Sequence, residues 1–212
     1  MRREHLLCVI PARGGSRRIP RKNIREFRGK PIIAYSIEAA EETGLFDDIV
    51  VSTEDAEIAE IATAYGATRI HPRRALMAAD DVGTQAVAAD VLRWYLDEAR
   101  RMPSLVCTLY ATAPLVATTD ILRGYGAMLF DPKADHAYAI APPGWSDIGQ
   151  FYWSRPLALL QDVDLNANPR HSWRVVVAKE RSCDINTEDD WNRALEMYDA
   201  LNRPQEPEKG PA

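Results

Sequence analysis

The chain has 212 residues, of which 46% are hydrophobic and 27% are charged, an ordinary composition for a globular protein. No stretch is apolar over the length of a membrane span, and no charged, apolar and small-residue leader opens the chain. We therefore expect a soluble, cytoplasmic protein without a membrane partner. Three cysteines lie far apart, which predicts neither a disulfide framework nor a zinc site; they are Cys8, Cys107 and Cys183.

The charge is unevenly distributed along the chain. The net charge is −5, yet residues 1–30 contain ten lysines and arginines and only two glutamates. A nucleic-acid-binding domain is usually basic over a whole face and interleaves aromatic side chains that stack on bases. Here the positive charge surrounds one glycine loop, which predicts a compact polyanion such as a nucleoside triphosphate rather than a nucleic acid.

Apolar runs alternate with helical patterns. In chain order, the pattern predicts a strand at 6–12, a helix at 31–44, a strand at 47–53, helices at 54–66 and 83–101, a strand at 104–111, a helix at 118–130, short strands at 136–142, 150–154 and 172–178, and a helix at 187–202. Threonine is the expected N-cap of the helices at 118–130 and 187–202, with Thr187 capping the second.

This alternation predicts an α/β fold with a single domain at 1–203 and a mostly parallel sheet that carries helices on both faces. The proline-rich, charged tail at 204–212 is expected to be disordered. Ligands of such sheets bind at the carboxyl ends of the strands, where the basic loop follows the first strand.

The loop reads "IPARGGSRRIPRKN" at 10–23. Gly14 and Gly15 allow backbone angles closed to other residues, so that consecutive N–H groups converge on phosphate oxygens. Arg13 and Lys22 add positive charge. The spacing is neither G-x-G-x-x-G nor a P-loop, which argues against a dinucleotide dehydrogenase or a kinase-type fold. The alternative is a solvated turn whose arginines serve solubility.

The stretch "IPARGGSRRIPRKNIREFRGKPIIAYSIEAA" resembles the opening signature of the acylneuraminate cytidylyltransferases, the CMP-sialic acid synthetase family. The similarity continues in order through "GLFDDIVVSTEDAEIAEIATAYGA", "YATAPL", "GQFYW" and "DINTEDDW", and the third and fourth segments resemble the pseudaminic acid branch. The resemblance implies a Rossmann-like nucleotidyltransferase fold. It also implies transfer of CMP from CTP to a nine-carbon 2-keto sugar acid, with Mg²⁺ and release of pyrophosphate.

The resemblance also assigns roles to residues of the basic loop. Arg13 and Lys22 would hold the triphosphate and take part in catalysis, and Asn23 would help to fix the nucleotide. The backbone of Ala12 and of residues 14–16, which end at Ser16, would line the nucleotide. These roles agree with phosphoryl transfer, which depends on positioning and on neutralisation of charge.

Two further segments are assigned to the nucleotide by the same resemblance. In the loop "HPRRALMAADDVGTQ" (71–85), Arg73 or Arg74 matches an arginine that reads cytosine, and Thr84 matches a small hydroxyl residue. The alternative is that Thr84 caps a helix and that both arginines face solvent. In "YATAPL", Ala111 would contact the nucleotide at the end of a buried strand, whereas Thr112 alone needs only a turn.

The metal pair of the family departs from its pattern here. The family has D-x-D where this chain reads "DIN", so that Asp184 and Asn186 would be the Mg²⁺ ligands, with Asp184 also catalytic. In an extended segment residues i and i+2 project to one face. An amide oxygen ligates without charge, so weaker metal binding is expected. Asp184 and Asn186 capping the next helix is the alternative. Other carboxylates remain open as substitutes, namely Asp80, Asp81 and Asp189.

The second departure is a missing segment. "AYAIAPPGW" is followed almost at once by "SDIGQFYW", where the family has an extension that pairs two subunits and helps to form the acceptor pocket. We therefore expect a monomer or a weak oligomer. Gln150 and Tyr152, with Trp153, are candidate acceptor contacts, although aromatic residues on strands are more often core.

Three functions follow from these features. The first is a cytidylyltransferase acting on a nonulosonic, pseudaminic-like acid. The second is a CTP-binding protein that has lost turnover, and the third is a nucleotidyltransferase with a smaller or different acceptor.

Overall fold

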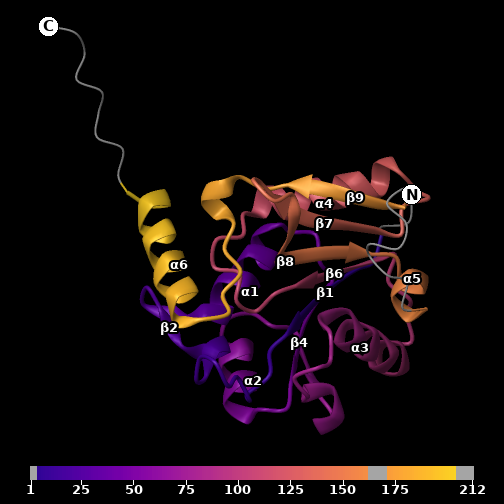
Figure 1. The fold of residues 1–212 in the computed structure, drawn as a ribbon. Helices are drawn as coiled ribbons and strands as arrows, with labels where there is room; N and C mark the ends of the chain where they lie inside the picture. Colours follow the sequence, from indigo (N-terminus) through magenta and orange to yellow (C-terminus); the bar gives the residue numbers. More distant parts are fainter. Residues whose placement is uncertain (1–3, 162–170, 204–212) are drawn as a thin grey trace, which may run out of the picture.

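The computed structural model describes residues 4–161 and 171–203. The tail at 204–212, expected to be disordered, lies outside the described residues. Seven strands form one sheet in the order β5–β4–β1–β6–β8–β7–β9 (Figure 1). Their bounds are β1 Leu6–Pro11, β4 Asp48–Thr53, β5 Arg69–Pro72, β6 Leu105–Leu109, β7 His136–Ala141, β8 Ser146–Ser154 and β9 Ser172–Val176.

Parallel pairing prevails in this sheet. β1 pairs in parallel with β4 and β6, β4 with β5, and β7 with β9. β8 runs antiparallel to both of its neighbours, β6 and β7. The predicted mostly parallel sheet is therefore confirmed, with β8 as the reversed strand.

Helices cover both faces of the sheet, as predicted. α1 (Ile32–Glu42), α2 (Ala56–Ala64) and α4 (Thr118–Phe130) pack on one face, and α3 (Thr84–Ala99) and α5 (Pro156–Leu160) pack on the other. Successive side chains of β1 alternate between these two layers, because side chains of a strand point to opposite faces. Leu6, Cys8 and Ile10 belong to the first layer and Leu7 and Val9 to the second.

The last helix, α6 (Glu188–Leu201), stands at the end of the sheet where β1 and β6 finish (Figure 1). It packs on a small hairpin of β2 (Glu26–Phe27) and β3 (Lys30–Pro31), where Trp191 and Phe27 meet edge to face at 5.5 Å between ring centroids. Short 3-10 turns complete the described chain: η1 Lys22–Ile24, η2 Ala75–Ala78 and η3 Lys179–Arg181. Helix α6 thus holds the preceding segment, residues 182–187, against the basic loop.

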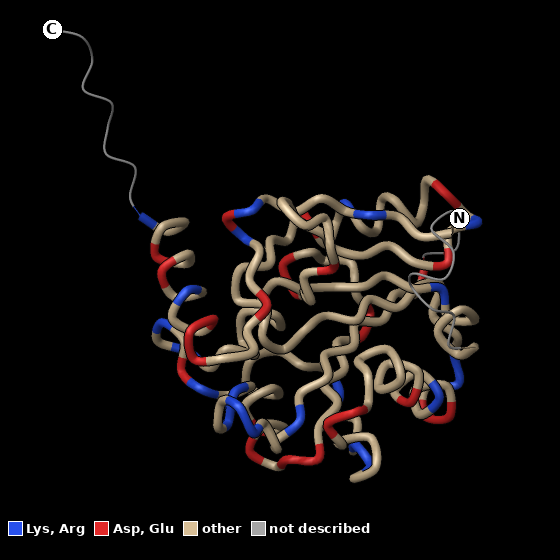
Figure 2. The backbone as a smooth tube through the Cα atoms, viewed as in Figure 1, with Lys and Arg blue, Asp and Glu red and all other residues tan. Residues whose placement is uncertain are grey.

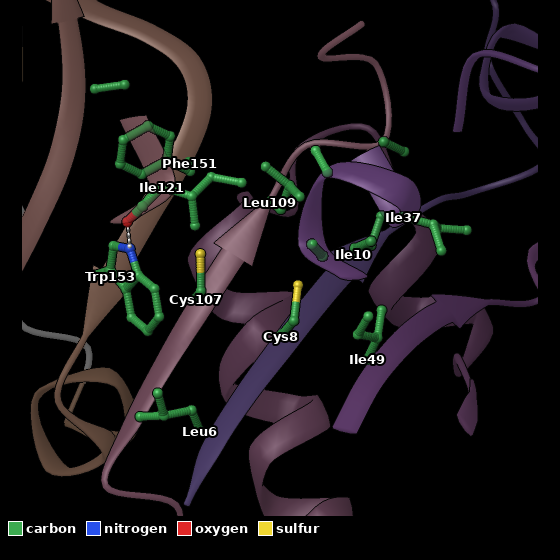
Figure 3. Close-up of a cluster of buried hydrophobic side chains, with 14 of the residues drawn as sticks. Leu6, Cys8, Ile10, Ile37, Ile49, Cys107, Leu109, Ile121, Phe151 and Trp153 are labelled. Carbon is green, nitrogen blue, oxygen red and sulfur yellow. Dashed lines mark hydrogen bonds between the residues drawn. The ribbon is translucent and has the colours of Figure 1, made fainter. Parts of the chain in front are cut away.

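The core explains the cysteines and one of the candidate acceptor aromatics. Cys8 and Cys107 lie side by side on β1 and β6 as free, fully buried thiols, and burial raises the pKa of both (Figure 3). Trp153 is also fully buried, and its Nε1–H donates to the Ile121 carbonyl oxygen at 3.0 Å. Trp153 is therefore a core residue.

Both threonine caps can be compared with the structure. Thr187 is the N-cap of α6, and Asp190 completes a capping box with it, as predicted. The cap expected at 118–130 is wrong, because α4 begins after Ala117 without a side-chain cap. The Thr118 hydroxyl instead donates to Glu42 Oε2 on α1 at 3.0 Å, which ties two helices of the same face together.

Candidate active site

A cavity of about 450 Å³ opens at the carboxyl ends of β1 and β6. The basic loop after β1 forms one wall, the segment 73–87 forms the second, and residues 110–112 after β6 form the third. Figure 2 shows the lysines and arginines of this loop gathered beneath α6, beside the acidic start of that helix. Residues from 10–23, 71–85, 110–115 and 184–186, four segments far apart in sequence, thus border one space. We call it the nucleotide cavity, after the ligand that the sequence predicts for it.

The glycine pair works differently from the prediction. Neither Gly14 nor Gly15 has a positive φ. Gly14 is instead required by space, since a Cβ there would lie 2.5 Å from Asp55 Oδ2. The Gly14 N–H donates to Glu54 Oε1 at 2.7 Å, so a carboxylate already holds this donor. Ser16 borders the cavity, whereas Gly14 and Gly15 do not.

Arg13 lines the cavity with an internal anion as its partner. Its Nη1 lies 2.5 Å from Asp80 Oδ1, and Arg17 Nε reaches Asp80 Oδ2 at 3.2 Å. Two arginines thus share one carboxylate. The same two positive charges could bind a polyphosphate at this place. Ala12 is buried behind this wall, and its N–H donates to the Ser52 carbonyl oxygen at 2.9 Å.

Lys22 and Arg18 connect the basic loop to the segment expected to bind metal. Lys22 Nζ donates to the Ile185 carbonyl oxygen at 2.7 Å, and Arg18 Nη2 donates to Asn186 Oδ1 at 3.0 Å. Burial lowers the pKa of Lys22, an effect that the nearby Asp184 carboxylate opposes. Asn23 is buried and fixes the loop itself, since its Nδ2 donates to the Arg13 carbonyl oxygen at 2.8 Å.

The structure distinguishes Arg73 from Arg74. Arg73 lines the cavity and is only 7% exposed, whereas Arg74 points outward and pairs with Asp90. Arg73 Nε donates to Ser52 Oγ at 3.2 Å, and its buried Nη2 has no hydrogen-bond partner among the described residues. Burial lowers the pKa of Arg73 to about 10, which leaves it charged at neutral pH. An unpartnered buried donor facing a cavity is suited to a ligand acceptor atom.

Thr84 also faces the cavity and does not cap α3, whose N-cap is Gly83. Its hydroxyl donates to Tyr110 Oη at 3.1 Å, and Tyr110 Oη lies 3.4 Å from Tyr152 Oη. Tyr152 in turn donates to Asp147 Oδ2. Tyr110 was missed by sequence reasoning, although its place directly after β6 is the signal that could have identified it. Ala111 and Thr112 line the cavity beside it.

Asp184 and Asn186 lie side by side at the far end of the cavity, which Asn186 lines and Asp184 does not. Asn186 Nδ2 donates to Asp184 Oδ2 at 2.6 Å, and neither caps α6, since Thr187 does. Solvent reaches Asp184, yet the surrounding protein displaces enough water to raise the pKa of its carboxyl, against the opposing effects of Asn186 and Lys22. Loss of water around a carboxylate disfavours its charged form.

The donor set at this end suits a divalent ion that arrives with a triphosphate. Among the described residues, no group of three or more His, Cys, Asp or Glu could hold a metal ion. Mg²⁺ usually takes one or two carboxylates together with substrate phosphates and waters, which Asp184 and bound CTP would supply. The Asn186 oxygen is engaged by Arg18. Asp80 is paired with arginines, and Asp81 and Asp189 do not line the cavity.

The candidate acceptor residues are buried behind the cavity wall. Gln150 is 1% exposed, its Nε2 donates to the Arg181 carbonyl oxygen, and its Oε1 has no partner among the described residues. Tyr152 is 3% exposed and connects Tyr110 to Asp147. A second cavity of about 260 Å³ lies on the other side of Asp184; no sequence motif pointed to it.

A family model described as cytidylyltransferase matches residues 7–139. The pseudaminic acid cytidylyltransferase of Campylobacter jejuni is 34% identical over 225 residues, covering 91% of this chain and 95% of that protein. The chain belongs to the cytidylyltransferase family. The match spans 225 aligned positions but covers only 91% of the 212 residues here, which is about 193. About 32 positions of that relative therefore have no counterpart in this cytidylyltransferase.

Solved structures share the fold of this cytidylyltransferase. A CMP:2-keto-3-deoxy-manno-octonic acid synthetase complexed with CTP is 16% identical with a TM-score of 0.73, covering 93% of this chain and 99% of that one. A Mycobacterium tuberculosis protein in complex with manganese is 16% identical with a TM-score of 0.63, covering 91% and 98%. Both confirm the predicted nucleotidyltransferase fold. No helix in residues 4–161 and 171–203 has the length and apolar character needed to cross a bilayer.

Proposed function

We propose that this cytidylyltransferase transfers CMP from CTP to a nonulosonic acid of the pseudaminic class and releases pyrophosphate. The observation that carries the proposal is the meeting of Arg13, Lys22, Arg73 and Asn186 around one cavity. Its volume of about 450 Å³ lies within the range of small-molecule sites.

The charges around the cavity give CTP one orientation. The triphosphate lies against Arg13, Ser16 and Lys22, and Arg13 exchanges its internal partner Asp80 for phosphate oxygens. The cytosine end then lies toward Arg73, whose unpartnered Nη2 donates to a ring acceptor. A charged donor that is already buried and held by Ser52 forms a strong hydrogen bond without further ordering.

The reaction joins one oxygen to phosphorus and releases another. The anomeric hydroxyl oxygen of the acid attacks the α-phosphorus of CTP, the bond from that phosphorus to the β-phosphate oxygen breaks, and the hydroxyl proton leaves to water. Asp184 and Asn186 would hold Mg²⁺ together with the phosphates, and the ion would neutralise charge on the triphosphate. Arg13 and Lys22 hold the chain in line and stabilise charge on the leaving pyrophosphate.

The test is pyrophosphate release from CTP and Mg²⁺ with pseudaminic acid, N-acetylneuraminic acid and 2-keto-3-deoxy-manno-octonic acid as acceptors. We expect release with pseudaminic acid above the rate without acceptor, and loss of release in Arg13→Gln and Asp184→Asn. The outward Arg74→Gln is the matched control for charge. CTP binding by calorimetry without release on any acceptor would contradict the proposal and favour a CTP-binding protein without turnover. Release with an unrelated small acceptor alone would contradict the nonulosonic assignment.

A further inference from the structure

The second cavity lies between the turn that joins β7 to β8 and the segment that leads into α6. Its walls are residues 141–144 and 146–148 on one side and residues 179, 182–184, 190 and 193 on the other. Asp184 lines this cavity, whereas Asn186 lines the nucleotide cavity, and their side chains are hydrogen-bonded at 2.6 Å. The two cavities therefore meet at the segment 184–186.

The three carboxylates of the second cavity, Asp147, Asp184 and Asp190, accept hydrogen bonds from protein groups, Asp184 from Asn186 Nδ2 at 2.6 Å. Asp190 accepts from the N–H groups of Asn186 and Thr187 at 3.0 and 2.8 Å. Asp147 accepts from the Gly149 N–H at 2.9 Å and from the Tyr152 hydroxyl. Because Asp147 and Asp190 accept these hydrogen bonds from the protein, they do not form an empty cation site.

The cations of the cavity are in the opposite condition. Lys179 and Arg193 both line it, and no hydrogen bond or ion pair joins either side chain to a residue that the structure describes, although the charge of Arg193 contributes to the lowered pKa of Asp190. The hydroxyls of Ser146 and Ser182 line it as well. Two cations whose hydrogen-bond donors have no acceptor among the described residues, together with neutral hydroxyl groups, suit an anion that carries hydroxyl groups.

We propose that this second cavity binds the acceptor acid, with Lys179 and Arg193 recognising its carboxylate. The inference rests on the proposed function for the nature of the ligand. In the ring form of a 2-keto sugar acid, the carboxylate and the anomeric hydroxyl are bonded to the same carbon. Anchoring the carboxylate therefore fixes the hydroxyl one carbon away, on the side of Asp184 that faces the nucleotide cavity.

The experiment measures steady-state kinetics and CTP binding for Lys179→Gln, Arg193→Gln and the double variant. We expect the KM for the acid to rise about tenfold or more in each single variant, since a hydrogen bond between two charged groups is lost, while the Kd for CTP stays within about twofold. Lys133→Gln and Arg101→Gln remove exposed cations before β7 and β6, at the opposite end of the sheet, and are expected to leave both values unchanged. Unchanged KM in the double variant would overturn the proposal.

A binding measurement separates this proposal from the proposed reaction. Saturation-transfer NMR with CTP present compares pseudaminic acid with its methyl ester, which lacks the negative charge. We expect the wild-type chain to prefer the acid and the double variant to lose that preference, whether or not pyrophosphate is released. If the double variant loses the preference for the acid but the wild-type chain releases no pyrophosphate, the result would contradict the proposed reaction and leave the acceptor site standing. Absence of any preference for the acid in the wild-type chain would overturn the acceptor site.

Discussion

The setting of Arg73 depends on a buried serine. Ser52 Oγ accepts from Arg73 Nε at 3.2 Å and lies 3.0 Å from His71 Nδ1, and all three side chains are buried. Ser52 therefore fixes the guanidinium from behind, on the side away from the cavity. Removing the hydroxyl leaves Nε without its acceptor and frees the side chain to rotate.

We expect Ser52→Ala to weaken CTP binding about fivefold to tenfold, because one hydrogen bond to a charged group is lost. Calorimetric titration with CTP measures it. Ser154 forms the same kind of buried pair with His136, at 3.0 Å on β8 and β7. Ser154→Ala is thus the matched control and should reduce stability similarly without changing CTP affinity. Equal CTP binding in both variants would refute the role of Ser52.

The exchange of a carboxylate for an amide at position 186 leads to a second prediction. Asn186→Asp gives the site a second charged oxygen ligand beside Asp184, which Mg²⁺ favours. It also places two carboxylates where an amide now donates at 2.6 Å, so the pair repels until a cation is bound. We expect the affinity for Mn²⁺ with CTP present to rise about tenfold, equivalent to about 1.4 kcal/mol.

Electron paramagnetic resonance of Mn²⁺ titrations measures this affinity, with Asp184→Asn as the variant that should lose it. A rise in Asn186→Asp that persists without Asp184 would point to a different ligand. No change in either variant would mean that the metal is bound elsewhere.

At the scale of elements, sequence patterns predicted what periodicity and composition encode. Apolar runs identified β1, β4 and β6, and the basic residues after β1 identified one wall of the cavity at the carboxyl ends of β1 and β6. β5 was missed because "RIHP" is short and mostly polar. The internal anions at Glu54 and Asp80 and the second cavity were missed because they arise from contacts between segments far apart in sequence, for which no local motif exists.

The start of β8 lines the second cavity, and Gly149 follows it in a left-handed conformation. Its φ is +58°, and an added Cβ would lie 3.4 Å from the Tyr110 ring and 3.5 Å from the Asp184 carboxyl. A non-glycine residue in this left-handed region costs about 1–2 kcal/mol. The glycine therefore lets the strand pass between the Tyr110 ring and the Asp184 carboxyl.

We expect Gly149→Ala to lower the free energy of unfolding by about 1–2 kcal/mol and to reduce kcat as Asp184 shifts. Urea unfolding and steady-state assays measure the two effects. Gly126 lies inside α4 with open space where a Cβ would stand, so Gly126→Ala should stabilise by about 0.5–1 kcal/mol. A Gly149→Ala variant as stable and active as wild type would contradict the constraint.

At the scale of the molecule, His71 couples stability to pH. Burial lowers the pKa of His71, with Asp90 opposing and Arg73 and Arg74 adding to the effect. In the unfolded chain, His71 takes up a proton as the pH falls below its ordinary pKa of about 6.5. In the folded chain, His71 takes up that proton only at a lower pH. Stability rises with pH wherever the unfolded state holds more protons, so this contribution is lost as pH falls below about 6.5.

We expect the free energy of unfolding to decrease between about pH 7 and pH 5.5, and the decrease to be smaller in His71→Gln, which has no proton to take up. Urea unfolding at several pH values measures the slope. A slope unchanged in His71→Gln would assign the pH dependence to other groups.

The oligomeric state is the last property that we predict from the missing segment. The family resemblance ties dimer formation to an extension that is absent between residues 142 and 150. A stable interface buries about 1,200–2,000 Å² in total, which the missing segment would have helped to supply. We therefore expect light scattering after gel filtration to give the monomer mass of 23.8 kDa, with or without CTP. A tight dimer with undiminished activity would show that another surface pairs the subunits, and loss of activity on its dissociation would mean that the second cavity is not complete in one chain.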